Sequence, residues 1–256
     1  MKKGKKVNME NNWIKVSSKR VDSKYKLICI PYAGSGSNIF YKWQKVIGKD
    51  VEILPVQLPG REKRITEECM TDCEKVVEGI AGQLINLIDD HEFAIFGHSM
   101  GGIIAYELCR QLQKKYNISP KICFISASHI DADNEKIYLS KLDDEAFVQK
   151  LRQYGGINDE ILKYPEFFDV FVKILKNDFR LIENYTISED DKVIHVPIRN
   201  YIGTDDNLMK MEKMNDWREY TDLGYTYRIF NGNHFFISDE ANMKEICSDI
   251  CKYLSK

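Results

Sequence analysis

Short apolar runs alternate along this chain with longer stretches in which apolar residues recur every three or four positions. The short runs predict buried strands, at Tyr25–Pro31, Val51–Gln57, Glu92–Phe96, Lys121–Ala127, His195–Ile202 and Tyr225–Phe230. The periodic stretches predict helices, at Thr71–Asp89, Met100–Lys114 and Glu240–Leu254. Strands that alternate with helices form a mostly parallel central sheet with helices on both faces, so the pattern predicts an α/β fold.

The alternation stops after Ser128 and resumes at His195. Residues 130–190 contain helical patterns at Asp143–Tyr154 and Pro165–Tyr185 but no convincing strand. We interpret this block as a helical lid insertion over one end of the sheet. An ordinary helical excursion that covers a sheet edge is the alternative.

Length and charge limit the classes of protein to which the chain can belong. Its 256 residues suit one domain, which we place at residues 23–256 after a basic, solvated tail of residues 1–22. The formal net charge of −2 argues against a nucleic-acid binder. No apolar stretch approaches the ~18 residues of a membrane helix. We therefore expect a monomer with neither nucleic acid nor a membrane as its partner.

The cysteines indicate the redox state of the compartment in which the protein works. The chain has seven of them, an odd number, which favours free thiols and a reducing, cytoplasmic setting. Cys69 and Cys73, and likewise Cys247 and Cys251, are four positions apart, which predicts that each pair shares one face of a helix and serves packing. A zinc site made of both pairs is the alternative, and nothing local supports it.

A serine stands at the turn between a predicted strand and the helix that follows it. The turn reads Gly97-His98-Ser99-Met100-Gly101, and the two glycines remove side chains that would clash in a sharp turn. A serine held in this way points out of the end of the sheet, which is typical of an activated nucleophile. Ser99 is therefore the candidate nucleophile.

A serine hydroxyl needs a base within hydrogen-bond reach, and the base needs a carboxylate that fixes its tautomer. In sheets of this type the acid and then the histidine follow the serine along the chain. His234 follows the last predicted strand, and of the five histidines only this one has both the order and the position of a base. Asp205 and Asp206 follow the strand before it. We prefer Asp206 as the acid and assign Asp205 to a turn or a helix cap.

An acyl-transfer intermediate also needs hydrogen-bond donors for its oxyanion. The backbone N–H of Met100, directly after the candidate nucleophile, is one candidate donor. The loop after the first strand, Pro31–Ser37, is rich in small residues and offers the N–H of Ala33 as the second. A phosphate-binding loop is the alternative for this segment, but no Gly-Lys-Ser or Gly-Lys-Thr follows it.

Several segments together resemble the type II thioesterases that accompany nonribosomal peptide and polyketide synthases, which are stand-alone α/β-hydrolases. The matching segments are Ile30–Gly34, Phe40–Trp43, Gln57–Glu62, Phe96–Gly102, Gly203–Asp206 and Gly232–Phe236. Residues 58–62, Leu-Pro-Gly-Arg-Glu, are far more selective than the serine turn alone. The chain departs from the family in its Ala-Gly-Ser-Gly loop, in Asn233 before the histidine and in its long N-terminal extension, but keeps every catalytic group.

The resemblance implies hydrolysis of thioesters on the phosphopantetheine arm of acyl or peptidyl carrier protein domains, in editing or in release. It implies no metal and no cofactor beyond the arm that the substrate carries. Five apolar residues of the insertion are candidates either for an acyl pocket or for simple core: Phe147, Leu151, Phe167, Phe168 and Phe171. A small-molecule carboxylesterase on the same fold and a non-catalytic binding module are the alternative functions.

Overall fold

The computed structural model describes residues 12–15, 22–88, 91–130, 138–153, 164–187, 191–208 and 211–256. Its centre is a six-stranded sheet in the order β2-β1-β3-β4-β5-β6. The strands are β1 (Tyr25–Ile30), β2 (Val51–Pro55), β3 (Glu92–His98), β4 (Cys123–Ser126), β5 (Ile198–Gly203) and β6 (Tyr225–Phe230). All neighbouring pairs among them are parallel, which confirms the predicted α/β fold.

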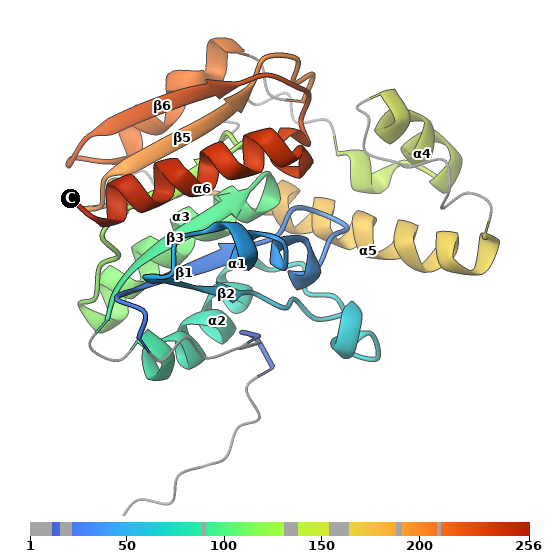
Figure 1. Cartoon of the computed structure of the whole chain (residues 1–256). Helices are drawn as coiled ribbons and strands as arrows, with labels where there is room; N and C mark the ends of the chain where they lie inside the picture. Colours follow the sequence, from blue (N-terminus) through green and yellow to red (C-terminus); the bar gives the residue numbers. More distant parts are fainter. Residues whose placement is uncertain are drawn as a thin grey trace, which may run out of the picture.

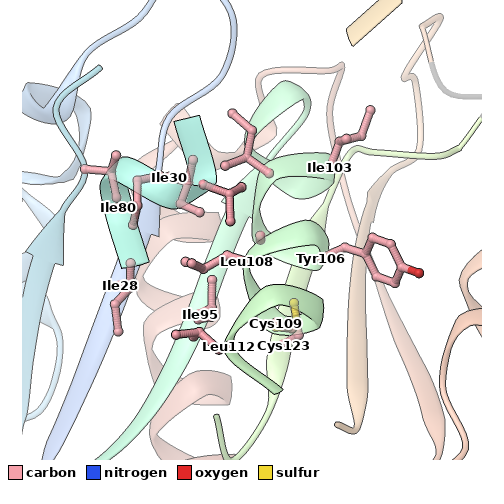
Figure 2. Close-up of a cluster of buried hydrophobic side chains, with 14 of the residues drawn as sticks. Ile28, Ile30, Ile80, Ile95, Ile103, Tyr106, Leu108, Cys109, Leu112 and Cys123 are labelled. Carbon is pink, nitrogen blue, oxygen red and sulfur yellow. The ribbon is translucent and has the colours of Figure 1, made fainter. Parts of the chain in front are cut away.

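Helices cover both faces of the sheet (Figure 1). α2 (Cys73–Ile88) and α3 (Met100–Gln111) share a core with one set of strand side chains, including Ile28, Ile30 and Ile95 (Figure 2). α1 (Trp43–Val46) and α6 (Glu240–Leu254) share a second core with the alternate set, including Cys29 and Phe96. Side chains alternate between the faces of a strand, so strands covered on both faces are apolar throughout.

Two further helices, α4 (Asp144–Gln153) and α5 (Pro165–Glu183), occur between β4 and β5. They pack on each other through a separate apolar cluster: Leu139, Phe147, Val148, Leu151, Val172 and Leu175. In Figure 1 both helices lie to one side of the sheet, where α5 passes beneath α4. α5 also contacts α3 and the loop after β1, so it lies at the carboxyl ends of the strands.

Short helical turns complete the described structure. They are η1 (Ser37–Phe40), η2 (Glu62–Arg64), η3 (Leu112–Tyr116), η4 (Leu139–Lys141), η7 (Met211–Tyr220) and η8 (Phe236–Ser238). The predicted helix Met100–Lys114 is therefore α3 followed by the π-type turn η3. β5 begins at Ile198 rather than at His195, because the preceding Pro197 has no N–H to donate to the neighbouring strand.

The N-terminal segment differs from the solvated tail that we expected at residues 1–22. Of these the structure describes residues 12–15 and residue 22. Ile14 is 2% exposed and pairs antiparallel with Val56, and the N–H of Trp13 donates to Gln83 at 3.0 Å. These residues pack on the domain because Trp13 and Ile14 bury apolar surface that a solvated tail would expose.

The strand order reverses between β1 and β3. The connection from β1 leads to β2 on one side, whereas β3 pairs with β1 on the other. In open parallel sheets such a reversal leaves a crevice at the carboxyl ends of the two strands, and ligands bind there. The loop that carries Ala33 and the turn that carries Ser99 both lie at this position.

Candidate active site

Ser99 has a strained backbone conformation at the turn from β3 into α3. Its φ is 54° and its ψ is −119°, a combination that residues other than glycine rarely adopt. The turn is so tight that a Cβ atom added to Gly97 would lie 1.9 Å from the carbonyl oxygen of Gly101. The N–H of Ser99 donates to the carbonyl oxygen of Ser126 at 2.8 Å, which ties the turn to β4.

His234 and Asp206 meet beyond the carboxyl ends of β6 and β5. Nδ1 of His234 lies 2.8 Å from Oδ2 of Asp206, and the two side chains are 5% and 0% exposed. Oδ1 of Asp206 accepts the N–H of Leu208 at 2.9 Å, which fixes the carboxylate. Because an ionised carboxylate only accepts hydrogen bonds, Nδ1 of His234 carries the proton and Nε2 is left as an acceptor.

The neighbouring Asp205 has a different environment. It is exposed, and its Oδ2 accepts the Thr204 hydroxyl at 2.8 Å. Of the two candidate acids, it is therefore Asp206 that the fold brings to His234.

His98 is completely buried beside this pair. Its Nε2 lies 2.9 Å from the carbonyl oxygen of His234, and its Nδ1 lies 2.8 Å from the hydroxyl of Ser126. A carbonyl oxygen only accepts, so Nε2 donates and Nδ1 accepts from the hydroxyl. Burial, reinforced by the nearby His234, lowers the pKa of His98 well below its usual value. Neutral His98 thus holds the backbone of His234, a role that the sequence alone did not indicate.

Ser99 and His234 line one cavity of about 260 Å³, together with Ala33 and Met100. The four residues predicted to act as nucleophile, base and oxyanion donors therefore share one space. The insertion supplies much of the remaining wall: Leu139, Phe179, Ile182, Glu183 and Tyr185.

The five apolar residues that we singled out in the insertion do not line this cavity. Phe147 and Leu151 are buried in the α4–α5 cluster, and Phe168 and Phe171 pack against it. Phe167 is 68% exposed. Of the two alternatives left open for these residues, simple core agrees with the positions of four of them. Helix periodicity identifies an apolar face without identifying which part of it borders a cavity.

The loop after β1, which carries Ala33, is held by two side chains from distant parts of the chain. Asp178 of α5 accepts the N–H of Gly34 at 2.7 Å and is 2.6 Å from the Arg61 guanidinium. Arg61 also donates to the carbonyl oxygen of Ser35 at 3.0 Å. Burial by itself lowers the pKa of Arg61, but the Asp178 carboxylate outweighs it and the pKa is raised.

The far end of the same loop is held by Glu62. Its carboxylate accepts the Ser37 hydroxyl at 2.6 Å and the Asn38 N–H at 2.9 Å. Glu62 itself has a φ of 49°, a left-handed conformation that is uncommon for residues other than glycine. Arg61 and Glu62 of the Leu-Pro-Gly-Arg-Glu segment therefore brace the candidate oxyanion loop.

Sequence reasoning assigned no role to Asp178, although a signal was present. Asp178 belongs to the helical stripe Phe171, Leu175, Asp178 and Ile182, in which the other three residues are apolar. A carboxylate on a buried helix face must have a partner, because a lone buried charge is strongly unfavourable. What the stripe does not reveal is that the partner is Arg61, 117 positions away.

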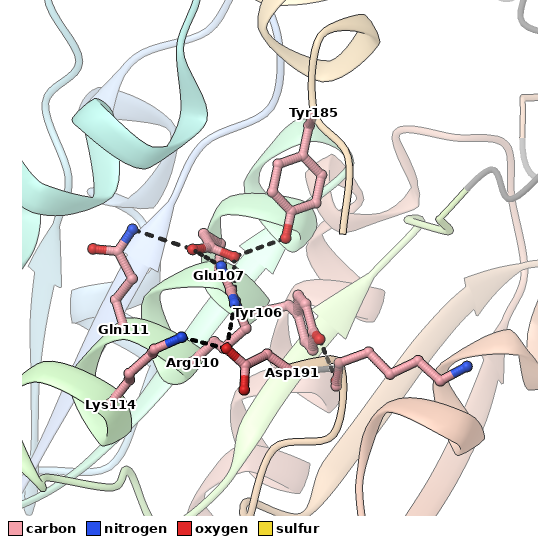
Figure 3. A network of polar contacts seen from close by, with 8 residues as sticks. Tyr106, Glu107, Arg110, Gln111, Lys114, Tyr185 and Asp191 are labelled. Atoms are coloured by element: carbon pink, nitrogen blue, oxygen red, sulfur yellow. Dashed lines mark hydrogen bonds and ion pairs between the residues drawn. The ribbon is translucent and has the colours of Figure 1, made fainter. Parts of the chain in front are cut away.

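A second buried carboxylate, Glu107 of α3, holds the chain just after α5 (Figure 3). Its side chain accepts hydrogen bonds from Arg110 at 2.8 Å and from the Tyr185 hydroxyl at 2.8 Å. Burial, reinforced by the Glu107 charge, raises the pKa of Tyr185, so this hydroxyl stays protonated and can donate. Tyr185 also lines the cavity, so the Glu107 network fixes one part of its wall.

Metal-ligating residues do not cluster in the part of the chain that the structure describes, where no group of three or more His, Cys, Asp or Glu could hold a metal ion.

The two cysteine pairs differ in their positions. Cys69 precedes α2, so the prediction that it shares a helix face with Cys73 is wrong, whereas Cys247 and Cys251 both belong to α6. None of the described helices has the length and apolarity needed to cross a membrane.

Known proteins share this architecture over almost the whole chain. The model of the thioesterase domain family matches residues 25–254. The gramicidin S biosynthesis protein GrsT of Aneurinibacillus migulanus is 32% identical over 97% of this chain and 96% of its own length. The solved structure of the thioesterase RedJ, from the prodiginine pathway of Streptomyces coelicolor, has a TM-score of 0.84 at 29% identity and covers 92% of each chain.

A second similar structure is BorB, the type II thioesterase of the borrelidin biosynthetic cluster. It has a TM-score of 0.81 at 26% identity and covers 94% of this chain and 97% of its own. Fold and relatives together define an enzyme of the α/β-hydrolase class. The chain belongs to the thioesterase domain family, and its resemblance to the type II thioesterases is confirmed.

Proposed function

We propose that this enzyme hydrolyses acyl or peptidyl thioesters on the phosphopantetheine arm of carrier protein domains, in editing or release during nonribosomal peptide or polyketide synthesis. The similar proteins support this substrate class, because RedJ and BorB are named as thioesterases of biosynthetic pathways and GrsT is named for gramicidin S biosynthesis. The observation that carries the chemistry is that His234, in contact with Asp206 at 2.8 Å, lines the same cavity as Ser99.

The proposed reaction has two half-reactions. Nε2 of His234 takes the proton of the Ser99 hydroxyl as its oxygen attacks the thioester carbonyl carbon. When the tetrahedral intermediate collapses, the carbon–sulfur bond breaks and the arm leaves as a thiol, with the proton from His234. Water, deprotonated by the same histidine, then attacks the acyl-serine, and the acid is released as Ser99 regains its proton.

The negative charge of each tetrahedral intermediate needs fixed donors. We assign this role to the backbone N–H groups of Ala33 and Met100, since both residues border the cavity that holds Ser99. Met100 is the first residue of α3, where the helix dipole also favours negative charge. Asp206 keeps the His234 ring in the required tautomer and stabilises its charged form.

We further propose that α4 and α5 form a lid over this cavity, because Phe179 and Ile182 of α5 line its wall. A cavity of about 260 Å³ lies at the small end of ligand sites, so motion of the lid would admit the arm and longer acyl groups. The reaction consumes only water and needs no cofactor. The seven free cysteines fit a reducing cytoplasm, and we propose that the enzyme works there as a monomer.

The test is a hydrolysis panel with acyl-pantetheine and acyl-carrier substrates. We expect Ser99→Ala to abolish turnover and His234→Ala to lower kcat by three orders of magnitude or more (~10³-fold). A fluorophosphonate probe should label the native protein at Ser99 but leave Ser99→Ala unlabelled. Circular dichroism and urea unfolding serve as the control that both variants fold.

Two results would contradict the proposal. Wild-type turnover in either variant would show that the substituted residue takes no part in the reaction. A strong preference for simple oxygen esters, with no activity on carrier thioesters, would favour a small-molecule carboxylesterase on this fold instead.

A further inference from the structure

Asp178 is the point at which α5 contacts the candidate oxyanion loop through charge rather than through apolar packing. Its side chain is 2% exposed. Its Oδ2 accepts hydrogen bonds from the N–H of Gly34 at 2.7 Å and from Nη1 of Arg61 at 2.7 Å. Its Oδ1 accepts a hydrogen bond from Nη2 of Arg61 at 2.6 Å. One carboxylate of α5 therefore satisfies donors from two loops that lie at different places along the chain.

The apolar contacts around Gly34 place α5 directly against the loop. Gly34 has a φ of 76°, and a Cβ atom added there would lie 2.6 Å from a methyl carbon of Leu175 in α5. Apolar packing this close holds the loop near the helix, but it does not orient the peptide groups of the loop. The hydrogen bond from the Gly34 N–H to Asp178 supplies that direction.

Fixing the N–H of Gly34 fixes the peptide plane between Ala33 and Gly34, because the peptide bond is planar. The N–H of Ala33 belongs to the neighbouring plane, which is separated from it only by the φ and ψ rotations of Ala33. Arg61 limits the loop on its other side through the carbonyl oxygen of Ser35. The Ala33 N–H is thus positioned by local hydrogen bonds from Ser35 to the Tyr32 carbonyl oxygen and, on its other side, by the Gly34–Asp178 contact, which exists only while α5 is in place.

α5 also borders the cavity in which the acyl group would lie. Phe179, the residue after Asp178, lines the cavity, as does Ile182 one turn further along. The same turn of helix therefore borders the cavity and holds the loop beside it. Displacement of α5 would leave Asp178, Arg61 and the Gly34 N–H without their partners, at a substantial cost for buried groups.

We propose that Asp178, paired with Arg61, is a positioning residue that couples the seating of α5 to the formation of the oxyanion hole. With α5 seated, the carboxylate orients the Ala33 peptide and the hole is complete; with α5 displaced, the Ala33 donor is lost and hydrolysis slows. This inference rests on the proposed function, since it assigns a hydrolytic role to the Ala33 N–H.

The experiment replaces the pair by apolar side chains of similar size, in the double variant Arg61→Met with Asp178→Leu. Such a replacement removes the Gly34 hydrogen bond without leaving a lone buried charge, so the fold is retained. We expect kcat on acyl-pantetheine to fall by about 10²- to 10³-fold, the effect of losing one oxyanion donor, with little change in KM. Asp178→Asn keeps one acceptor oxygen and should lose less.

Two ligands separate positioning from general damage. A trifluoromethyl ketone analogue of acyl-pantetheine forms an oxyanion on addition of the serine, so its affinity should fall in parallel with kcat. The corresponding amide analogue forms none, so its affinity should stay near the wild-type value. The matched control is Asp144→Asn, which breaks the exposed pair between Asp144 of α4 and Lys176 of α5 without touching the loop. It should retain wild-type kinetics.

Hydrogen exchange gives a readout that does not need activity. In the double variant, amides of residues 32–37 should exchange faster than in the wild type, while those of the central strands should not change. Wild-type kcat in the double variant, equal loss of ketone and amide affinity, or unchanged exchange in the loop would overturn the proposal. Absence of thioesterase activity in the wild type would instead refute the proposed function, and the exchange data would still decide whether α5 orders the loop.

Discussion

The two halves of the site are held together in different ways. The base half, Asp206 and His234, follows two neighbouring parallel strands, and backbone hydrogen bonds from Thr204 to the end of β6 and from Asp205 to Gly232 continue that pairing. The oxyanion half, the loop with Ala33, is held by side chains of Arg61, Glu62 and Asp178. The first half is thus tied to the sheet through its backbone, whereas the second depends on side chains from elements outside the sheet, one of which is α5.

The largest effect should come from the base half, at Asp206. We expect Asp206→Asn to lower kcat by about 10³- to 10⁴-fold, because an amide can donate to Nδ1 and so stabilise the wrong tautomer of His234. The matched control is Asp205→Asn, whose side chain contacts Thr204 and not the histidine. It should keep a kcat near the wild-type value in acyl-pantetheine hydrolysis. Equal losses in the two variants would contradict the assignment of Asp206.

A smaller effect should follow when the far end of the oxyanion loop is released. Glu62→Ala removes the acceptor of the Ser37 hydroxyl and of the Asn38 N–H, and we expect kcat to fall by at most about 10²-fold through misplacement of the loop. Glu67→Ala is the control, because Glu67 pairs with Arg64 in the same segment and is 41% exposed. If both variants behave alike in steady-state kinetics, the contacts of Glu62 do not position the loop.

The smallest effect concerns stability rather than rate, and it depends on His98. The pKa of His98 is lowered in the folded protein, so below about pH 6.5 the unfolded chain binds a proton that the native state does not. The free energy of unfolding should therefore fall toward acid pH, by up to about 1.4 kcal/mol per pH unit from this one group.

The variant His98→Asn isolates that contribution. It should be less stable than the wild type at pH 8, because the hydrogen bonds to Ser126 and His234 are altered, but the difference should shrink by pH 5. Urea unfolding at the two pH values measures it. His195→Asn is the matched control, since it makes the same substitution at a histidine that is 68% exposed. A constant difference between wild type and His98→Asn would show that His98 does not titrate as its burial requires.

Prediction from sequence succeeded where the signal is local. β6 and α6 have the predicted bounds, because each is a periodic run with clear flanking residues; the side chain of Asp239, for example, caps α6 by accepting two N–H groups. The turn at Ser99 was likewise predictable, since Gly97 and Gly101 permit a close approach that other residues forbid. The preference for Asp206 over Asp205 rested only on spacing after Gly203.

Prediction was weaker where a side chain acts through a distant contact. Four of the five apolar residues that we singled out in the insertion lie in or against the α4–α5 cluster and Phe167 is exposed, whereas the cavity is lined by Phe179 and Ile182 of α5. Ile14 was assigned to a solvated tail although it pairs with Val56. In each case the residue type was informative, but its partner was decided by packing between segments.

The amino-acid sequence alone determined the type of fold, the candidate nucleophile and the order of its partners along the chain, because periodicity and turn residues act over a few neighbouring positions. Tertiary structure decided which aspartate contacts His234, which side chains line the cavity, and that the oxyanion loop lies against α5. These outcomes depend on contacts between residues 28 to 144 positions apart. Such contacts form only when the sheet, its helices and the insertion pack together, since a buried carboxylate is stable only where the fold brings it a donor.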